Sequence, residues 1–368
     1  MTKNRKNKII CILTALFFAA GFLLCVFLPK PEYLAAERRR AALRPELSLD
    51  AVMSGRFMDG FESWSTDTFP MRDQLRTVQA LTATRVFLQK DNNGIYDHKG
   101  ILAAVEYPMD PDSVRHAADR FRYLYDTYLT PETKVYLAVI PDKGCFLAKE
   151  SGHPAMDYEA FERLMADQTE FATLIPIRDL LSIDDYYRTD THWRQEKITD
   201  VADRLTEYMG GVLTADRADY EVHTPNQAFY GVYYGQAALP VEPENLCYLT
   251  DDVIDGYLVY DWQNGKEIPV YDLERAAGRD PYEMFLSGSL SLVTIENKAA
   301  EGGRSLVIFR DSFGSSIAPL LARSYERVTL IDIRYIQPDL LGQFVDFSDS
   351  DVLFLYSTLV LGHSETLK

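Results

Sequence analysis

The stretch that decides the fold is Arg304–Tyr335, which reads RSLVIFRDSFGSSIAPLLARSYERVTLIDIRY. Its apolar run Leu306–Phe309 predicts a buried strand. An amphipathic helix follows, with Ile317 and Leu321 on its apolar face, and Val328–Ile333 predicts a second strand. A strand, a helix and a strand in this order are typical of a sheet with parallel strands.

Ser312 lies between the end of the first strand and the first turn of the helix. Proteins of the α/β class place reactive groups at this point. The free N–H groups of a helix start can also hold a developing oxyanion there. The alternative is that Ser312 caps the helix, because Ser and Asp are the usual capping residues. The segment by itself leaves both interpretations open.

A second polar segment, Tyr187–Trp193 (YRTDTHW), lies far upstream of Ser312. A nucleophilic serine needs a base, and the base needs an acceptor that fixes its tautomer. His192 and Asp190 are two positions apart, so one can orient the other in a turn or at a strand end. Two alternatives stay open: Asp190 caps a helix that begins near Trp193, or His192 is a structural histidine.

The composition limits the classes of partner. The chain has 368 residues, which is enough for one large domain or two small ones with a sizeable core. Its net charge of −17 argues against a nucleic-acid partner, because neutralising phosphates requires clustered Lys and Arg. The same charge disfavours a cationic protein of the membrane surface.

The N-terminal segment predicts a membrane anchor. Basic residues at positions 3–8 precede Ile9–Leu28, an uncharged run long enough to cross a bilayer core of about 30 Å. Basic residues before the span place the N-terminus in the cytoplasm and the remainder outside. No Ala-x-Ala cleavage site directly follows the run. Residues 1–30 are therefore predicted to form an uncleaved signal anchor and not a signal peptide that is removed.

The rest of the chain predicts an α/β protein. Strand and helix signals alternate over residues 91–368, with a buried strand at Val135–Ile140, a helix at Trp193–Met209 and a final strand at Val352–Tyr356. This alternation predicts a mostly parallel sheet flanked by helices.

Two regions read differently. Residues 31–90 predict a juxtamembrane helical region, whose first part, residues 31–47, is rich in Ala and Arg. Residues 213–290 are rich in turns and tyrosine with little helical periodicity, and they predict a β-rich insertion beside the sheet.

The sequence lacks the motifs of metal binding, of nucleotide binding and of the α/β-hydrolases. No two histidines have the spacing of zinc ligands on a helix, and Cys-x-x-Cys is absent, so we expect no metal. Phosphate-binding and dinucleotide-binding glycine motifs are also absent, so we expect no cofactor. Ser312 lacks the Gly-x-Ser-x-Gly context of the α/β-hydrolases. Whether Cys145 and Cys247 pair stays open.

Asp190-Thr191-His192-Trp193, followed far downstream by Asp311-Ser312-Phe313, resembles the DHHW protein family. That family resembles the SGNH-hydrolase-like enzymes that O-acetylate alginate at the cell envelope. The resemblance covers most of the chain outside the anchor. Further matching fragments are Asp67-x-Phe69-Pro70-x-Arg72, Val139-Ile140-Pro141-Asp142-Lys143, Asp280-Pro281-Tyr282 to Leu286, Val293-Thr294-Ile295, Asp332-Ile333-Arg334-Tyr335 and Asp351-Val352-Leu353.

The sequence departs from the family pattern at two places. Thr191 stands where the family usually has the middle His of Asp-His-His-Trp. The segment FLSGS at 285–289 stands where relatives commonly have Gly-Gly-Asn, whose Asn would serve as an oxyanion donor. The resemblance then leaves Gly288 or Ser289, together with the backbone N–H of Ser312, as oxyanion donors. Arg334 is a further candidate for substrate binding, with an ion pair as the favoured alternative.

The resemblance implies an SGNH-like α/β fold and a function. Ser312 would be the nucleophile, His192 the general base, and Asp190 the residue that holds the imidazole. The implied activity is that of an extracytoplasmic O-acyltransferase that acetylates a cell-envelope or secreted polysaccharide. A multi-pass membrane O-acyltransferase would supply the acyl group. The alternatives are a polysaccharide O-acetyl esterase of the same fold and a non-catalytic protein that binds glycan or scaffolds an exopolysaccharide assembly system.

Overall fold

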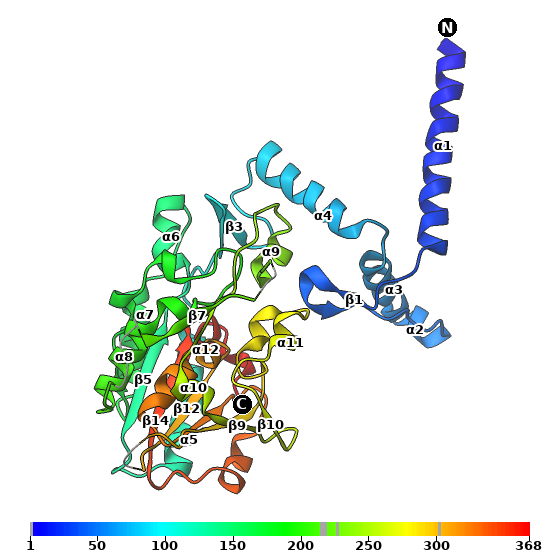
Figure 1. Cartoon of the computed structure of the whole chain (residues 1–368). Coiled ribbons are helices and arrows are strands. Elements are labelled where there is room, and N and C mark those ends of the chain that lie inside the picture. Colours follow the sequence, from blue (N-terminus) through cyan, green and yellow to red (C-terminus); the bar gives the residue numbers. More distant parts are fainter. Residues whose placement is uncertain (1–2, 214–218, 226–227, 301–302) are drawn as a thin grey trace. The chain divides into compact units, whose positions relative to one another are not determined.

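The structure is a computed structural model that describes residues 3–213, 219–225, 228–300 and 303–368 (Figure 1). The chain divides into two units. The N-terminal unit comprises Met1–Asn92 and Gly235–Pro240, and the α/β unit comprises Asn93–Tyr234 and Val241–Lys368.

The N-terminal unit is mainly helical from residue 49 onwards. Its elements are α1 (Lys3–Phe27), β1 (Tyr33–Leu34), β2 (Arg39–Arg40), α2 (Leu49–Met53), α3 (Arg56–Asp67), α4 (Arg72–Leu81) and a π-helical continuation (Thr82–Val86). Residues 31–47 hold a single 3-10 turn (Ala35–Glu37) instead of the helix predicted there, because β1 and β2, on either side of this turn, pair as a short antiparallel hairpin.

An ion-pair cluster accounts for this local difference. Arg39 donates to both carboxylate oxygens of Asp67, each at 2.7 Å, and the backbone N–H of Ala42 donates to the same carboxylate at 2.9 Å. The hydrogen bond from Arg39 is the main cause that lowers the pKa of the Asp67 carboxyl. Arg72, the last residue of the Asp67–Arg72 fragment, lies 3.6 Å from Asp67. This fragment of the sequence therefore fixes the hairpin to the end of α3.

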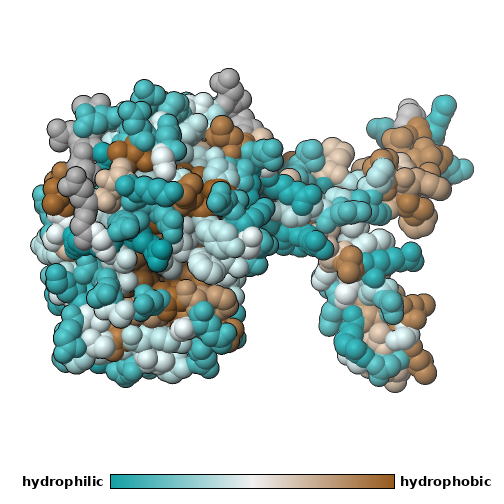
Figure 2. Space-filling view, turned by 60° about the horizontal axis from the view of Figure 1, so that its bottom comes forward, coloured by the Kyte–Doolittle hydropathy of each residue, from teal (hydrophilic) through white to brown (hydrophobic). Residues whose placement is uncertain are grey.

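Helix α1 contains a candidate membrane span. Its segment Arg5–Phe27 is long and apolar enough to cross a membrane, and none of it is buried against the rest of the chain. Its apolar side chains colour this part of the surface brown, whereas the surface of the α/β unit is mostly hydrophilic or intermediate in the same view (Figure 2). The chain therefore carries a candidate anchor at its N-terminal end.

The α/β unit is built on one central sheet. Five adjacent strands, from β13 to β6, are parallel, and β11, β9 and β10 continue the sheet as antiparallel strands. The spatial order is β10 (Lys266–Ile268), β9 (Leu258–Asp261), β11 (Leu292–Glu296), β13 (Arg327–Ile331), β12 (Ser305–Arg310), β14 (Ser350–Ser357), β5 (Val135–Ile140) and β6 (Thr173–Leu174). The predicted mixed α/β fold with a mostly parallel sheet is confirmed.

Helices cover both faces of this sheet (Figure 1). The α-helices from residue 93 onwards are, in chain order, α5 (Pro111–Tyr128), α6 (Gly144–Ser151), α7 (Tyr158–Gln168), α8 (Thr199–Tyr208), α9 (Val232–Ala237, of which Gly235 onwards belongs to the N-terminal unit), α10 (Asp252–Asp255), α11 (Leu273–Ala276), α12 (Phe313–Leu321) and α13 (Thr358–Leu361). Helices α5 and α7 pack on one face, and α8 and α12 pack on the other. Two small antiparallel pairs complete the unit: β3 (Ile95–His98) with β4 (Ile101–Ala104), and β7 (Glu221–His223) with β8 (Tyr248–Thr250).

Strand β12 shows why the deciding stretch is apolar throughout. Successive side chains of a strand point to opposite faces of the sheet. Val307 and Phe309 accordingly pack in the core against α5, while Leu306 and Ile308 pack in the core against α12. A strand that is buried on both faces has no solvent side, so its residues form a continuous hydrophobic run rather than an alternating one.

Two predicted elements differ from the structure. The helix expected at 193–209 begins only at Thr199, because Trp193 is buried and forms an antiparallel bridge with Tyr186. In residues 213–290, strands β9 and β10 are part of the central sheet rather than of a separate β-rich insertion. The rest of this segment, where described, is β7, β8, the short helices α9, α10 and α11, a 3-10 helix (Pro281–Met284) and turns.

The fold predicts a large cost for shortening β12 side chains. Ile308 is fully buried, so we expect Ile308→Ala to lower the free energy of unfolding by about 2–5 kcal/mol. Urea unfolding followed by circular dichroism measures this change. Leu273→Ala on α11, where the side chain is 53% exposed, is the control and should cost much less. Equal losses in the two variants would contradict the buried position of β12.

Candidate active site

The carboxyl ends of three parallel strands meet at one edge of the sheet. Strand β12 pairs with β14, and β14 pairs with β5, so that all three strands end side by side. The residues that follow them, Asp311-Ser312, Thr358 and Asp142-Lys143, therefore gather at this edge. Ligands and reactive groups of α/β proteins are usually found at such an edge.

Ser312 precedes helix α12 without capping it. Its backbone is helical, with φ −62° and ψ −24°, and its side chain makes no cap hydrogen bond. Asp311 takes that role, because its Oδ1 accepts from the N–H of Phe313 at 3.0 Å. The other oxygen, Oδ2, accepts from the N–H and the hydroxyl of Ser357 at 2.8 and 2.6 Å. The capping interpretation of Ser312 is therefore wrong, and its hydroxyl is left for another contact.

That contact is with His192. The Oγ atom of Ser312 lies 2.7 Å from Nε2 of His192, and Nδ1 of His192 lies 2.5 Å from Oδ1 of Asp190. An ionised carboxylate only accepts hydrogen bonds, so Nδ1 carries the proton and Nε2 accepts from the serine hydroxyl. The structure thus brings together the three residues that the sequence singled out, in the order serine, imidazole, carboxylate.

The Asp190 carboxylate is held by backbone groups from both sides. Oδ1 also accepts from the N–H of His192 at 3.1 Å, and Oδ2 accepts from the N–H of Val232 at 2.8 Å. A Cβ atom at Gly231 would lie 2.3 Å from Cα of Asp190, so only glycine lets the chain pass this close. Asp190 does not cap a helix at Trp193, because no helix begins there.

Aromatic packing fixes the plane of the imidazole. The ring of Tyr282 stacks on His192 with centroids 3.7 Å apart and planes 8° apart. The hydroxyl of Tyr282 and the indole N–H of Trp193 both donate to Oγ of Ser316, each at 2.9 Å. Burial raises the pKa of the Tyr282 hydroxyl well above its usual value, which keeps this donor neutral. Trp193 therefore has a packing role, in line with the alternative given above.

A fully buried lysine supports the segment that carries the carboxylate and the imidazole. Nζ of Lys143 donates to the backbone carbonyls of Tyr187 and Arg188 at 2.9 and 3.2 Å, and it lies 5.0 Å from the ring centroid of Tyr233. Burial lowers the pKa of Lys143 to about 7, although the nearby Asp190 and Glu244 carboxylates oppose this shift. Lys143 thus orders the backbone two and three residues before Asp190.

Glu244 holds the same backbone from another direction. Its Oε2 accepts from the N–H of Arg188 at 2.7 Å. Its Oε1 accepts from the N–H and the hydroxyl of Thr189, both at 2.7 Å. Sequence reasoning missed both supports. Lys143 had two signals, its place directly after a strand end and its place in the fragment Val139–Lys143 that resembles the family, whereas Glu244 lies in an irregular segment and had none.

Of the three predicted oxyanion donors, one has a free N–H group and the other two do not offer a donor to Ser312. The backbone N–H of Ser312 has no partner among the described residues. The N–H of Gly288, at φ +88°, donates to the carbonyl of Phe285 at 3.1 Å. Ser289 is exposed, and within the described chain no hydrogen bond joins it to Ser312. Ser312 itself is therefore the donor that the geometry offers.

Arg334 is engaged in an ion pair. Its Nε and Nη2 atoms donate to the two carboxylate oxygens of Asp332 at 2.9 and 2.7 Å. These contacts raise the pKa of Arg334 against the opposing effect of burial. The ion-pair alternative thus describes its position in the structure.

Metal ligands and disulfides do not mark this site. Within residues 3–213, 219–225, 228–300 and 303–368, no group of three or more His, Cys, Asp or Glu side chains could hold a metal ion. The cysteines are free, so Cys145 and Cys247 do not pair in this structure.

Comparison with solved structures identifies the fold. A DHHW family protein from Eubacterium siraeum superposes with a TM-score of 0.61 at 20% sequence identity, covering 75% of this chain and 97% of that one. This chain has the fold of a DHHW family protein. PatB1 of Bacillus cereus, in a structure with a sulfonyl adduct, gives a TM-score of 0.57 at 19% identity and covers 73% of this chain and 95% of that one. No protein-family model and no curated protein matches the sequence.

The buried lysine predicts a dependence of stability on pH. The folded pKa of Lys143, about 7, lies below its ordinary value of 10.5, so between these values the unfolded chain binds the extra proton. The free energy of unfolding should therefore rise with pH in this window, by up to about 1.4 kcal/mol per pH unit. In Lys143→Met this rise should be lost.

Urea unfolding at about pH 7 and about pH 9, followed by tryptophan fluorescence, to which the buried Trp193 contributes, measures the difference. Lys149→Met removes an exposed lysine from α6 and should keep the pH dependence of the unchanged protein. The same slope in Lys143→Met and in the unchanged protein would show that Lys143 is not the group responsible.

Proposed function

We propose that Ser312, His192 and Asp190 form the triad of an acyl-transfer enzyme. The observation that carries the proposal is the 2.7 Å contact between Oγ of Ser312 and Nε2 of His192, with the Asp190 carboxylate 2.5 Å from the other ring nitrogen. Nucleophile, base and orienting acceptor in this geometry activate a serine hydroxyl for attack on a carbonyl carbon.

The reaction divides into two balanced steps. Oγ of Ser312 attacks the acyl carbonyl while Nε2 of His192 takes its proton, and the bond to the donor's leaving group then breaks as His192 returns that proton to it. An acyl-serine results. A hydroxyl of the acceptor attacks the acyl-serine, His192 takes the hydroxyl's proton, and Oγ of Ser312 leaves with a proton from His192. The open N–H of Ser312 faces the oxyanion of each tetrahedral intermediate.

The reaction class is O-acetylation of a polysaccharide hydroxyl outside the cytoplasm. The basic residues at positions 3–8 and the candidate span in α1 support an orientation with the α/β unit outside. Acetyl-CoA is absent from that side, so the donor is an acyl group handed across the bilayer by a multi-pass membrane O-acyltransferase. Fold likeness to PatB1, solved with a sulfonyl adduct, is compatible with a nucleophile that reacts with sulfonyl reagents.

We expect a sulfonyl fluoride to modify Ser312 of the full chain in detergent, as located by peptide mass spectrometry. Ser312→Ala should abolish the modification. Asp190→Asn should slow it by about 10³–10⁴-fold, because the amide no longer holds the imidazole in the tautomer that accepts the serine proton. Ser63→Ala, which removes an exposed hydroxyl on α3, is the control and should react like the unchanged protein. Modification elsewhere with Ser312 intact would contradict the triad.

The acceptor is tested with an activated acetyl ester and a glycan. Transfer predicts that acetyl groups appear on the glycan, as seen by mass spectrometry, and that they are absent with Ser312→Ala. Free acetate without acetylated glycan would instead indicate an ester hydrolase of the same fold. If the chain released no acetyl group and Ser312 did not react with the sulfonyl fluoride, the chain would be a non-catalytic glycan-binding or scaffold protein.

A further inference from the structure

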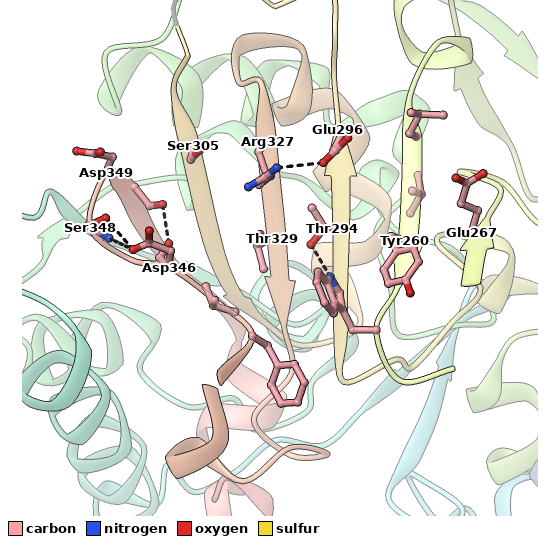
Figure 3. Close-up of a pocket in the computed structure, with 16 residues that line it drawn as sticks. Tyr260, Glu267, Thr294, Glu296, Ser305, Arg327, Thr329, Asp346, Ser348 and Asp349 are labelled. Carbon is pink, nitrogen blue, oxygen red and sulfur yellow. Dashed lines mark hydrogen bonds and ion pairs between the residues drawn. The ribbon is translucent and has the colours of Figure 1, made fainter. Parts of the chain in front are cut away.

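A groove of about 610 Å³ opens on one face of the central sheet (Figure 3). Its floor is formed by strands β9, β11 and β13 and by the first residue of β12, and one wall is formed by residues 344–350. All of these elements belong to the α/β unit. The groove lies at the amino ends of the parallel strands β12 and β13, whereas Ser312 lies beyond the carboxyl end of β12.

Along this face of the sheet the residues change from apolar to polar. Alternate residues of a strand share a face, so each strand can be followed in steps of two. The apolar residues at one end belong to the core against α5, and the polar residues at the other end line the groove. The steps are Phe309, Val307, Ser305 on β12, Ile331, Thr329, Arg327 on β13, and Leu292, Thr294, Glu296 on β11. This face is thus built to be open at the groove.

Exposed aromatic rings stand beside the floor. Trp262 is 43% exposed, and its indole N–H donates to Oγ1 of Thr294 at 2.9 Å, which fixes the ring. Tyr260 packs against it edge to face with centroids 5.1 Å apart, and Phe344 lies 6.3 Å from it. Rings that are held rigid and partly exposed offer apolar faces to a ligand without a loss of side-chain freedom.

Thr329 gives a separate indication of a ligand. It is only 7% exposed, yet its hydroxyl has no hydrogen-bond partner among the described residues. Its side chain lies on the floor of the groove between Arg327 and the loop that carries Asp346 (Figure 3). The hydroxyl is not one of the enclosed polar atoms that lack a partner in the described chain, so it is reachable from the groove and can bond to a ligand's polar group.

The charge of the groove restricts the ligand. Glu267, Glu296, Asp346 and Asp349 line it, and Arg327 is the basic residue among its lining residues. Arg327 is paired with Glu296 at 3.1 Å, so the lining keeps an excess of three carboxylates over basic groups. An anionic polymer would be repelled here, amino-bearing groups would be attracted, and neutral sugars would meet no electrostatic barrier.

We propose that this groove binds a strand of glycan that lacks acidic groups, namely neutral sugars or sugars with free amines. The apolar faces of sugar rings pack on Tyr260 and Trp262, sugar hydroxyls bond to Thr329, and amines bond to Glu267 and Asp349. The groove is separate from Ser312, because the seven residue steps from Ser305 to Ser312 span roughly 20 Å. Its role as a holding site for the acceptor rests on the proposed function, but the binding itself does not.

Fluorescence titration of the full chain in detergent tests the binding. In a Trp64→Phe background the remaining tryptophans are the buried Trp193 and the exposed Trp262, so a saturable change reports the groove. We expect a glucosamine oligomer and an N-acetylglucosamine oligomer to bind, and a mannuronate oligomer not to bind. Tyr260→Ala should weaken binding at least about tenfold, and Thr329→Val about three- to tenfold, the loss of one hydrogen bond.

Tyr208→Ala on α8 removes an aromatic ring that is 47% exposed outside the groove, and it should bind as the unchanged protein does. Ser312→Ala should also bind normally, so a failure of the proposed function leaves the groove testable on its own. The proposal is overturned if neither non-acidic oligomer binds, if the mannuronate oligomer binds equally well, or if Tyr260→Ala binds unchanged. Binding of a lysine-rich peptide in place of the sugars would also overturn it.

Discussion

The candidate active site depends on the hydrogen bonds that the two oxygens of the Asp311 carboxylate accept. One oxygen accepts from the N–H of Phe313 at the start of α12, and the other accepts from Ser357 at the end of β14. The helix start is thereby tied to the neighbouring strand, and the capping role is taken by the residue before Ser312. The serine hydroxyl is left without a structural task, which allows it to face His192. A serine that capped its own helix would be a weaker nucleophile, because its lone pairs would be engaged.

The parts of this arrangement that follow local rules were predictable from the sequence. The strand and helix around Ser312 follow from an apolar run and helical spacing, and the pairing with His192 follows from what a nucleophile needs. The late start of α8 was not predictable, because Trp193 gains more from burial and two hydrogen bonds than from continuing a helix. Lys143 and Glu244 were not predictable either, since their contacts join segments that are distant in the sequence.

Lys143 and Glu244 support the site geometry, and burying the lysine lowers the stability of the fold. A lysine buried without a carboxylate in direct contact is costly, and the lowered pKa of Lys143 records that cost. Its ammonium and the Glu244 carboxylate instead satisfy backbone groups of the segment from Tyr187 to Thr189. An apolar side chain at position 143 would pack without this cost, but it would leave two carbonyls unbonded near Asp190. The segment is therefore rigid where the imidazole and its acceptor must keep their positions.

The same sheet carries two surfaces of different character at its two ends. At the carboxyl edge, the polar groups of Asp190, His192 and Asp311 are each engaged with another part of the chain, and the Ser312 hydroxyl is oriented by His192. At the amino ends, the hydroxyl of Thr329 and the carboxylates of Glu267 and Asp349 face a groove along β9, β11 and β13. An extended polymer differs from a small substrate in that it can occupy both surfaces at once. Under the proposed function, a surface that holds the polymer at a distance would raise the local concentration of its hydroxyl groups near Ser312 without touching the reacting atoms. The candidate active site needs fixed geometry, whereas the groove needs only broad contact with the polymer. These are two separate requirements, and the parallel strands of one sheet carry both surfaces.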